Sequence, residues 1–178
     1  MNMLSLFLVS LLFVGQLQTK DDCEPLTIIS SPSLEVNFTI DVSGTDFKVA
    51  KYLTGTLIYS TDGTISTEKP MFYVGRSAGI VSMQKQKRYS IDKIKRLPGG
   101  ETNCIKKINP ILIDNLPGYE IIAEGKSKSG KDQFVYQVIL FSEKGYFILV
   151  GMAPEELQSN LKSFKRITMS FRRKNTEG

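Results

Sequence analysis

The second half of the chain alternates between β-prone runs and short polar loops. Three such runs predict strands, at residues 119–124, 134–141 and 146–150. A turn at Leu116-Pro117-Gly118 precedes the first strand, and polar turns at residues 126–132 and 142–145 separate the three. Because strands joined by short loops pair with their neighbours in sequence, we expect an antiparallel meander.

The period of the pattern changes after the last of these strands. Apolar residues now recur at steps of 4, 3, 3 and 4, at Leu157, Leu161, Phe164, Ile167 and Phe171. This spacing places them on one stripe of a helix. Pro154-Glu155-Glu156 suits a helix start, since proline fits the first turn and acids favour the positive end of the dipole. We expect a helix over residues 154–172 that lies across the meander.

The first half of the chain carries a weaker pattern. Short apolar or alternating runs predict further strands, at residues 34–42, 56–60, 71–74 and 111–113. Residues 90–97 predict a short helix with Ser90 as its N-cap, ended by Pro98-Gly99-Gly100. The fold class expected is α+β: an antiparallel sheet packed with a C-terminal amphipathic helix and a short second helix.

The N-terminus carries an uncharged apolar segment. Residues 4–14 form a run of 11 apolar or small residues, and polar residues follow it. A bilayer-spanning helix needs about 20 residues, whereas the hydrophobic region of a signal peptide has this shorter length. We expect a signal peptide over residues 1–18 and a single exported α+β domain over residues 19–178, periplasmic or secreted, with no transmembrane segment after cleavage. A buried first strand or helix is the alternative.

Composition excludes several kinds of chemistry. The 178 residues include no histidine and only two cysteines. A Ser-His-Asp triad, a Cys-His pair and a histidine- or cysteine-rich metal site are therefore excluded, and we expect no cofactor and no metal. In an oxidising compartment Cys23 and Cys104 can form a disulfide that closes a loop of about 80 residues. Two free thiols are the alternative.

The last third of the chain resembles a known family in its order of motifs. Residues 111–174 contain the meander, Gly151 after its last strand, and Ser170-Phe171 near the end of the closing helix. This order resembles PsbP-like proteins, small α/β/α sandwiches named after an extrinsic subunit of the photosynthetic oxygen-evolving complex. The resemblance implies a non-enzymatic module that docks on larger partners, and it assigns no functional residue to this chain.

Positive charge is concentrated in two segments. The chain has a net charge of +5, but residues 83–107 carry eight basic and two acidic residues, and residues 162–178 carry six basic residues and one acidic residue. The first group is a possible anion-binding patch or a solvated basic face, formed by Lys85, Lys87, Arg88, Lys93, Lys95, Arg96, Lys106 and Lys107. We expect no nucleic-acid partner, because no binding motif is recognised.

Carboxylates remain as candidates for catalysis. Glu155 and Glu156 are adjacent on the predicted helix and do not face each other. Glu120 and Glu124 share one face of a strand, without a third acid for a cation site. We interpret Glu155 and Glu156 as charges of the first helical turn, and Glu120 and Glu124 as solvated charges. Residues 125–131 resemble a phosphate loop only superficially and are interpreted as a hairpin turn.

Together these patterns predict an exported, non-enzymatic binding or accessory protein. Its partner is expected to be an unidentified larger protein or an anionic component of the envelope, and the oligomeric state is left open. A small histidine-independent hydrolase that uses carboxylates is the alternative function.

Overall fold

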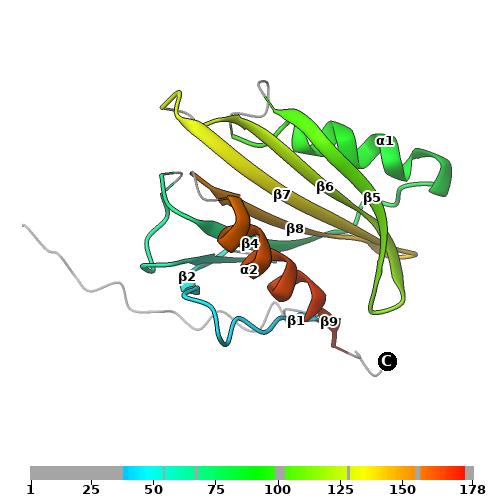
Figure 1. The fold of residues 1–178 in the computed structure, drawn as a ribbon. Helices are drawn as coiled ribbons and strands as arrows, with labels where there is room; N and C mark the ends of the chain where they lie inside the picture. The colour runs from blue at the N-terminus through cyan, green and yellow to red at the C-terminus, as the bar shows by residue number, and fades with distance from the viewer. Residues whose placement is uncertain are drawn as a thin grey trace, which may run out of the picture. The chain divides into compact units, whose positions relative to one another are not determined.

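A computed structural model describes residues 38–53, 55–66, 68–98, 103–127, 129–154 and 157–174. In it one seven-stranded antiparallel sheet has the order β2-β3-β4-β8-β7-β6-β5 (Figure 1). Its strands are β2 (Lys48–Leu53), β3 (Thr56–Ser60), β4 (Met71–Ser77), β8 (Gly145–Ala153), β7 (Asp132–Ser142), β6 (Leu116–Lys126) and β5 (Cys104–Ile113). A second, two-stranded pair joins β1 (Phe38–Thr39) to β9 (Arg172–Arg173).

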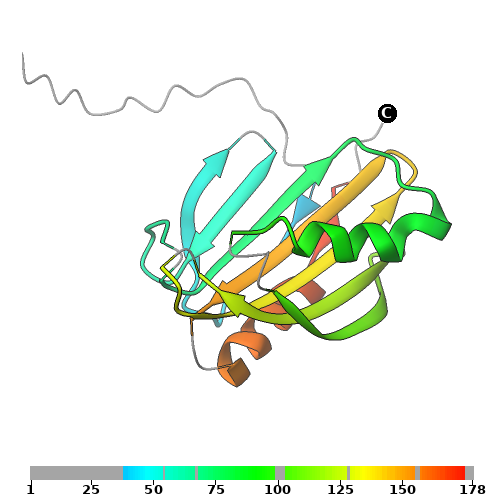
Figure 2. The same ribbon diagram turned by 90° about the horizontal axis from the view of Figure 1, so that it is seen from above.

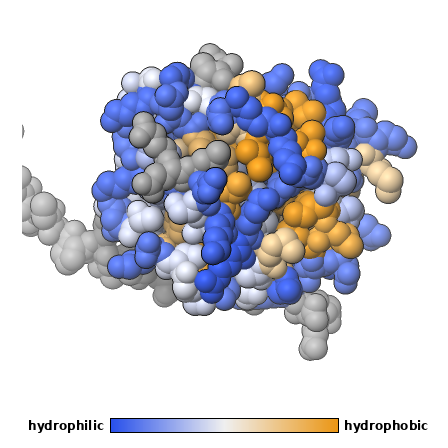
Figure 3. Space-filling model, in the orientation of Figure 1, coloured by the Kyte–Doolittle hydropathy of each residue, from blue (hydrophilic) through white to orange (hydrophobic). Residues whose placement is uncertain are grey.

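Two helices cover opposite faces of the large sheet (Figures 1 and 2). The helix α1 (Met83–Ile94) connects β4 to β5, and α2 (Leu157–Met169) follows β8. Side chains alternate along a strand, so β7 contributes to both layers: Val135 packs with α1, and Tyr136 packs with α2. Figure 3 views the molecule from the α2 side, where apolar patches appear between polar residues.

The core on the α2 side centres on the ring of Phe164. The ring is fully buried and stacks on those of Phe72, Phe134 and Tyr136, with centroids 5.8 to 6.4 Å apart. Aromatic stacking at such distances adds to the free energy gained by burying apolar surface. These contacts join α2 to β4 and β7, so this side chain anchors the closing helix.

The predicted fold class is confirmed. The meander consists of β6, β7 and β8, and the closing helix runs from Leu157 to Met169, shorter than the predicted 154–172. Its apolar stripe faces the sheet: Leu161 is partly buried, and Phe164, Ile167 and Phe171 are fully buried. Residues 155 and 156 and the side chain of Leu157 lie outside the described part. In that described part, neither helix has the length and apolarity that a bilayer crossing requires.

The prediction of a helix at residues 90–97 was wrong in its bounds. The helix α1 begins at Met83, so Ser90 lies inside it and is not an N-cap. The Ser90 side chain is buried, and its hydroxyl donates to the carbonyl oxygen of Gln86 at 2.9 Å. After Met83 the first turns of α1 consist of long polar residues that give no apolar periodicity, so the sequence pattern did not predict them.

Three further predictions need correction. The predicted turn at residues 116–118 belongs to β6, and the actual turn is Asp114–Asn115, whose φ angles of 50° and 59° are typical of a type I′ hairpin. The strand predicted at 111–113 extends back to Cys104 through a bulge after Ile105, which breaks the alternation. Of the strand predicted at 34–42, only Phe38–Thr39 is a strand, and residues 34–37 lie outside the described part.

Candidate functional site

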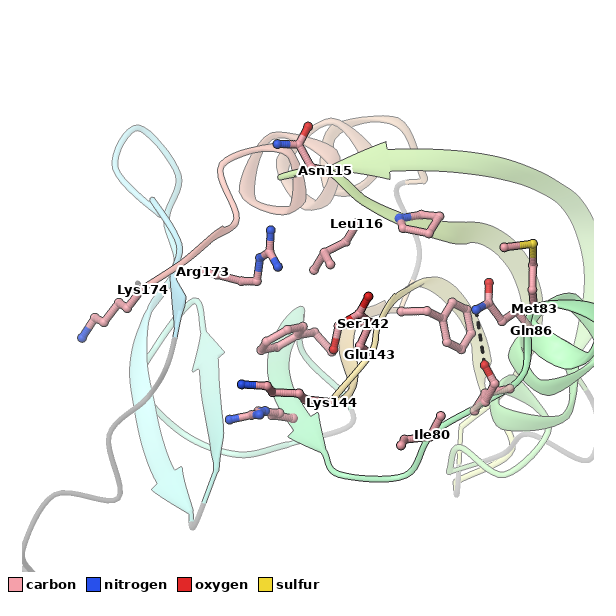
Figure 4. A pocket seen from close by; sticks show the side chains of 15 residues that line it. Ile80, Met83, Gln86, Asn115, Leu116, Ser142, Glu143, Lys144, Arg173 and Lys174 are labelled. Atoms are coloured by element: carbon pink, nitrogen blue, oxygen red, sulfur yellow. Dashed lines mark hydrogen bonds between the residues drawn. The ribbon is translucent and has the colours of Figure 1, made fainter. Parts of the chain in front are cut away.

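A groove of about 1050 Å³ opens at one end of the large sheet (Figure 4). It is formed by the β7–β8 hairpin, the β5–β6 hairpin, the segment from β4 to α1, and the residues of β9. Three buried apolar side chains belong to its lining, Leu116 and Phe147 on the α2 side of the sheet and Phe141 on the α1 side, and we call these three the floor; each is no more than 4% exposed. Small-molecule sites commonly have volumes of about 300–1,000 Å³, so the groove is large enough for a chain-like ligand.

The rim of the groove is basic. Four cationic side chains line it, those of Arg76, Lys144, Arg173 and Lys174, against one acidic residue, Glu143, as far as the described residues go. In Figure 4, Arg173 and Lys174 lie on the opposite side from Met83 and Gln86 of α1. A concave site with charges of one sign on its walls raises the local concentration of oppositely charged ligands. The groove therefore combines an apolar floor with a positive rim.

The hairpin turn between β5 and β6 fixes Arg173. The Arg173 backbone N–H and Nε donate to Oδ2 of Asp114 at 2.9 and 2.8 Å, and its Nη2 donates to the Asp114 carbonyl oxygen at 2.9 Å. Partial burial acts to raise the pKa of the Asp114 carboxyl. The hydrogen bonds and charge of Arg173 outweigh burial and hold this pKa below its usual value. Arg173 is thus held at the groove by a charged partner.

The opposite wall depends on Gly145, which begins β8. Gly145 has φ 131°, and a Cβ there would overlap the carbonyl oxygen of Ser77 at the end of β4. Only glycine allows this approach, which brings the β7–β8 turn with Lys144 against the last residues of β4. The Arg76 guanidinium lies 5.9 Å from the centre of the Phe147 ring, so a cation–π contact places a rim charge over the floor.

Two tyrosines and a lysine hold α1 on the sheet beside the groove. The hydroxyls of Tyr89 and Tyr146 are 2.7 Å apart, and Lys93 Nζ lies 5.2 and 5.6 Å from the centres of their rings. Burial raises the pKa of Tyr89. Burial also acts to raise the pKa of Tyr146, but hydrogen bonds with Ser77, Tyr89 and Lys93 outweigh it and lower that pKa. We interpret this cluster as an anchor for α1.

The predicted basic patch is divided between two faces of the sheet. Six of its members lie on α1 or directly after it: Lys85, Lys87, Arg88, Lys93, Lys95 and Arg96. The other two lie on β5 and face the α2 side, since Lys107 is the register partner of Ile122 and Lys106 forms an ion pair with Glu124 at 2.9 Å. None of the eight lines the groove.

The acidic residues singled out in the sequence do not form a catalytic pair. Glu120 is 7% exposed, so its interpretation as a solvated charge was wrong. Its carboxylate accepts a hydrogen bond from Asn109 Nδ2 at 2.9 Å and lies 3.3 Å from Lys165 Nζ of α2. Glu124 is exposed, and Glu155 and Glu156 lie outside the described part. Among the residues that the structure describes, no group of three or more potential metal ligands comes together.

The predicted hairpin turn connects β6 to β7, and its described residues are Ser127, Ser129, Gly130 and Lys131. The turn binds a carboxylate of the chain itself: Ser129 Oγ donates to Glu68 Oε1 at 2.5 Å, and Lys131 Nζ lies 2.9 Å from Glu68 Oε2. Cys104 is exposed at the start of β5, and Cys23 lies outside the described part, so their pairing stays a prediction.

Sequence reasoning missed the groove because four separate segments build it. They are residues 76–86, 115–117, 141–147 and 173–174, and no local pattern links them. One partial signal was present, since Arg173 and Lys174 belong to the second basic segment. The eight basic side chains of the first basic segment, which have the higher local density of charge, lie outside the lining.

Solved structures share this fold at low sequence identity. No family model and no curated protein matches the chain. The protein PA94 of unknown function from Pseudomonas aeruginosa, a putative regulator, is 17% identical with a TM-score of 0.53, over 68% of this chain and 84% of that protein. LpqN, involved in cell envelope biogenesis of Mycobacterium tuberculosis, is 15% identical with a TM-score of 0.55, over 76% of this chain and 82% of LpqN.

A protein from Bacteroides thetaiotaomicron also matches, with 10% identity and a TM-score of 0.51, over 80% of this chain and 47% of that protein. At these identities the likeness shows the fold alone. The resemblance to PsbP-like proteins was wrong, because the chain resembles PA94 and LpqN in structure and no family model supports the PsbP-like one. A meander closed by a helix is a general arrangement. Here Gly151 lies against the ring of Phe164, Phe171 stacks on Phe38, and Ser170 Oγ accepts a hydrogen bond from the backbone N–H of Asp41.

Proposed function

We propose that the chain is an exported, non-enzymatic binding protein whose groove holds an amphipathic anion. The apolar part of the ligand lies across the end of the sheet, over Leu116 and Phe147 on the α2 side and Phe141 on the α1 side. Its acidic group lies at the rim, near Lys144 and Arg173. The observation that carries the proposal is a single lining that holds apolar side chains from both faces of the sheet together with four cations.

Apolar burial in the groove supplies only part of the roughly 8 kcal/mol that micromolar binding requires. An alkyl chain that buries about 300 Å² of apolar surface gains roughly 7 kcal/mol, and losses of translational freedom offset much of this gain. Charge-assisted hydrogen bonds from arginine or lysine to a phosphate or carboxylate are among the stronger polar contacts. Both parts of the ligand are therefore needed for useful affinity.

The lining favours binding over hydrolysis. Acid–base hydrolysis by carboxylates uses a pair of acids across the reacting bond. Glu143 is the only acid in the described lining, and Glu120 lies in the α2 layer with Asn109 and Lys165 as partners. The hydrolase alternative thus has no observation in its favour at the groove.

The N-terminal apolar run supports export, and the shared fold is compatible with a role at the envelope. LpqN, which is described as involved in cell envelope biogenesis, has the same fold. An envelope is rich in amphipathic anions, so the proposed ligand class and the proposed location agree.

Calorimetric titration with dodecyl phosphate below its critical micelle concentration tests the proposal. We expect micromolar binding, and about tenfold weaker binding for Lys144→Glu, since a rim cation becomes an anion. The control is Lys162→Glu, an equal charge change at an exposed position on α2. Absence of binding, or an equal loss in both variants, would refute a groove that recognises the anion.

A further inference from the structure

Large apolar side chains stand exposed around the mouth of the groove. Ile80 and Met83 line it and are 75% and 78% exposed. Leu112 is 66% exposed and is the register partner of Pro117, another lining residue. Exposed apolar residues gathered beside one another mark interaction surfaces, whereas isolated ones need no explanation.

Cations lie in the same segments as these apolar side chains, although Lys85, two residues after Met83, lies on the other side of α1. Lys85 and Lys87 follow Met83 in the first turns of α1, and Lys144 lies on the β7–β8 turn. All three are exposed, and among the described residues none of them forms a salt bridge. Lys87 is four residues after Met83, so the two lie on one side of the helix.

We propose that this surface docks on an anionic lipid bilayer, with Ile80 and Met83 inserted at the level of the headgroups. Exposed apolar side chains flanked by lysines form the pattern of interfacial membrane binding. Each exposed lysine near an anionic leaflet adds about 1 kcal/mol of attraction, which amounts to roughly fivefold in affinity. A bilayer satisfies both features at once, because it offers an apolar layer beneath a negative surface.

The inference goes beyond the proposed function, since it concerns where the protein lies when it exchanges its ligand. Figure 4 shows Ile80 and Met83 on one side of the groove and Arg173 and Lys174 on the other. A bilayer contacted by Ile80 and Met83 therefore lies at the mouth of the groove. An amphipathic anion could then pass from the bilayer onto the apolar floor without crossing water.

Vesicle co-sedimentation of the exported protein tests the docking surface. Vesicles of phosphatidylglycerol and phosphatidylcholine should bind the protein, and vesicles of phosphatidylcholine alone should bind it at least tenfold more weakly. Inserting the exposed three quarters of one such side chain contributes roughly tenfold in affinity. Ile80→Gln/Met83→Gln should therefore weaken binding to the anionic vesicles by tenfold or more.

Val49→Gln is the matched control. Val49 is 61% exposed on β2, at the end of the sheet away from the groove, and its loss should change vesicle binding less than twofold. The inference would be overturned if the wild-type protein did not bind anionic vesicles, or if the double variant bound them as tightly as the wild type. Lys87→Glu, an exposed substitution outside the lining of the groove, should also weaken binding to the anionic vesicles and should keep the affinity for dodecyl phosphate within about threefold. Failure of docking is thereby separated from failure of the proposed function, which would abolish dodecyl phosphate binding in the wild type.

Discussion

The ring of Phe164 lies directly against the backbone of Gly151. A Cβ at position 151 would overlap this ring, so glycine is what allows α2 to pack closely on β8 at this point. The same ring contacts Phe72 and Phe134 on either side of β8 in the sheet. The position of the closing helix therefore depends on the ring of Phe164 and on the absence of a side chain at Gly151.

This pairing predicts a coupled effect on stability. Phe164→Ala should lower the free energy of unfolding by about 3–5 kcal/mol, because it leaves a cavity. Gly151→Ala should lower it by about 1–3 kcal/mol, because the methyl group forces the ring to move. The double variant should lose less than the sum, since the shortened side chain makes room for the methyl group.

Urea denaturation of the four proteins measures the coupling, and Lys162→Ala is an exposed control on the same helix with an expected change within about 0.5 kcal/mol. Strict additivity of the two core substitutions would contradict the close contact.

The Glu68 carboxylate should make stability depend on pH. Hydrogen bonds from Ser129 and Lys131 lower the pKa of Glu68 below its ordinary value of 4.5 in the folded protein. The ionised Glu68 carboxylate therefore stabilises the folded protein fully at pH values above its pKa in the unfolded chain. This stabilisation is lost as the pH falls through the pKa of Glu68 in the folded protein. The difference in unfolding free energy between wild type and Glu68→Gln should be larger at pH 7 than at pH 3. A difference that does not vary with pH would show that the contact is not charge-assisted.

The sequence predicted those elements in which burial imposes a period. Sequence periodicity predicted the strands β6 to β8 and the helical stripe at Leu161, Phe164 and Ile167. Each of these elements buries a regular set of apolar side chains. In α1, by contrast, only Ser90 and Ile94 are fully buried, so its periodicity is weak. The groove depends on Gly145 bringing two distant segments together, and such tertiary approaches leave no local pattern.

The two cysteines give a chemical prediction. Cys104 is exposed at the start of β5. We predict that it forms a disulfide with Cys23 in the exported protein. Thiol labelling of the denatured, unreduced exported protein should then find no reactive thiol. Two labelled thiols per chain would establish the alternative of free cysteines.

The N-terminal apolar run predicts processing. Mass spectrometry of the exported protein should show a new N-terminus between residues 16 and 20, because a signal peptidase cleaves after the hydrophobic region. An Asp21→Asn variant should be processed in the same way, since this residue follows the predicted site. Recovery of the intact chain beginning at Met1 from the cytoplasm alone would refute export.

The most direct test of the proposed groove is a titration of the ¹⁵N-labelled protein with dodecyl phosphate, followed by NMR. The backbone amides of Leu116, Phe141, Lys144 and Phe147 should shift in a saturable manner, while that of Val49 on β2 should stay unchanged. Shifts confined to the outer face of α1 or to β5, or no saturable shift at all, would contradict binding in the groove.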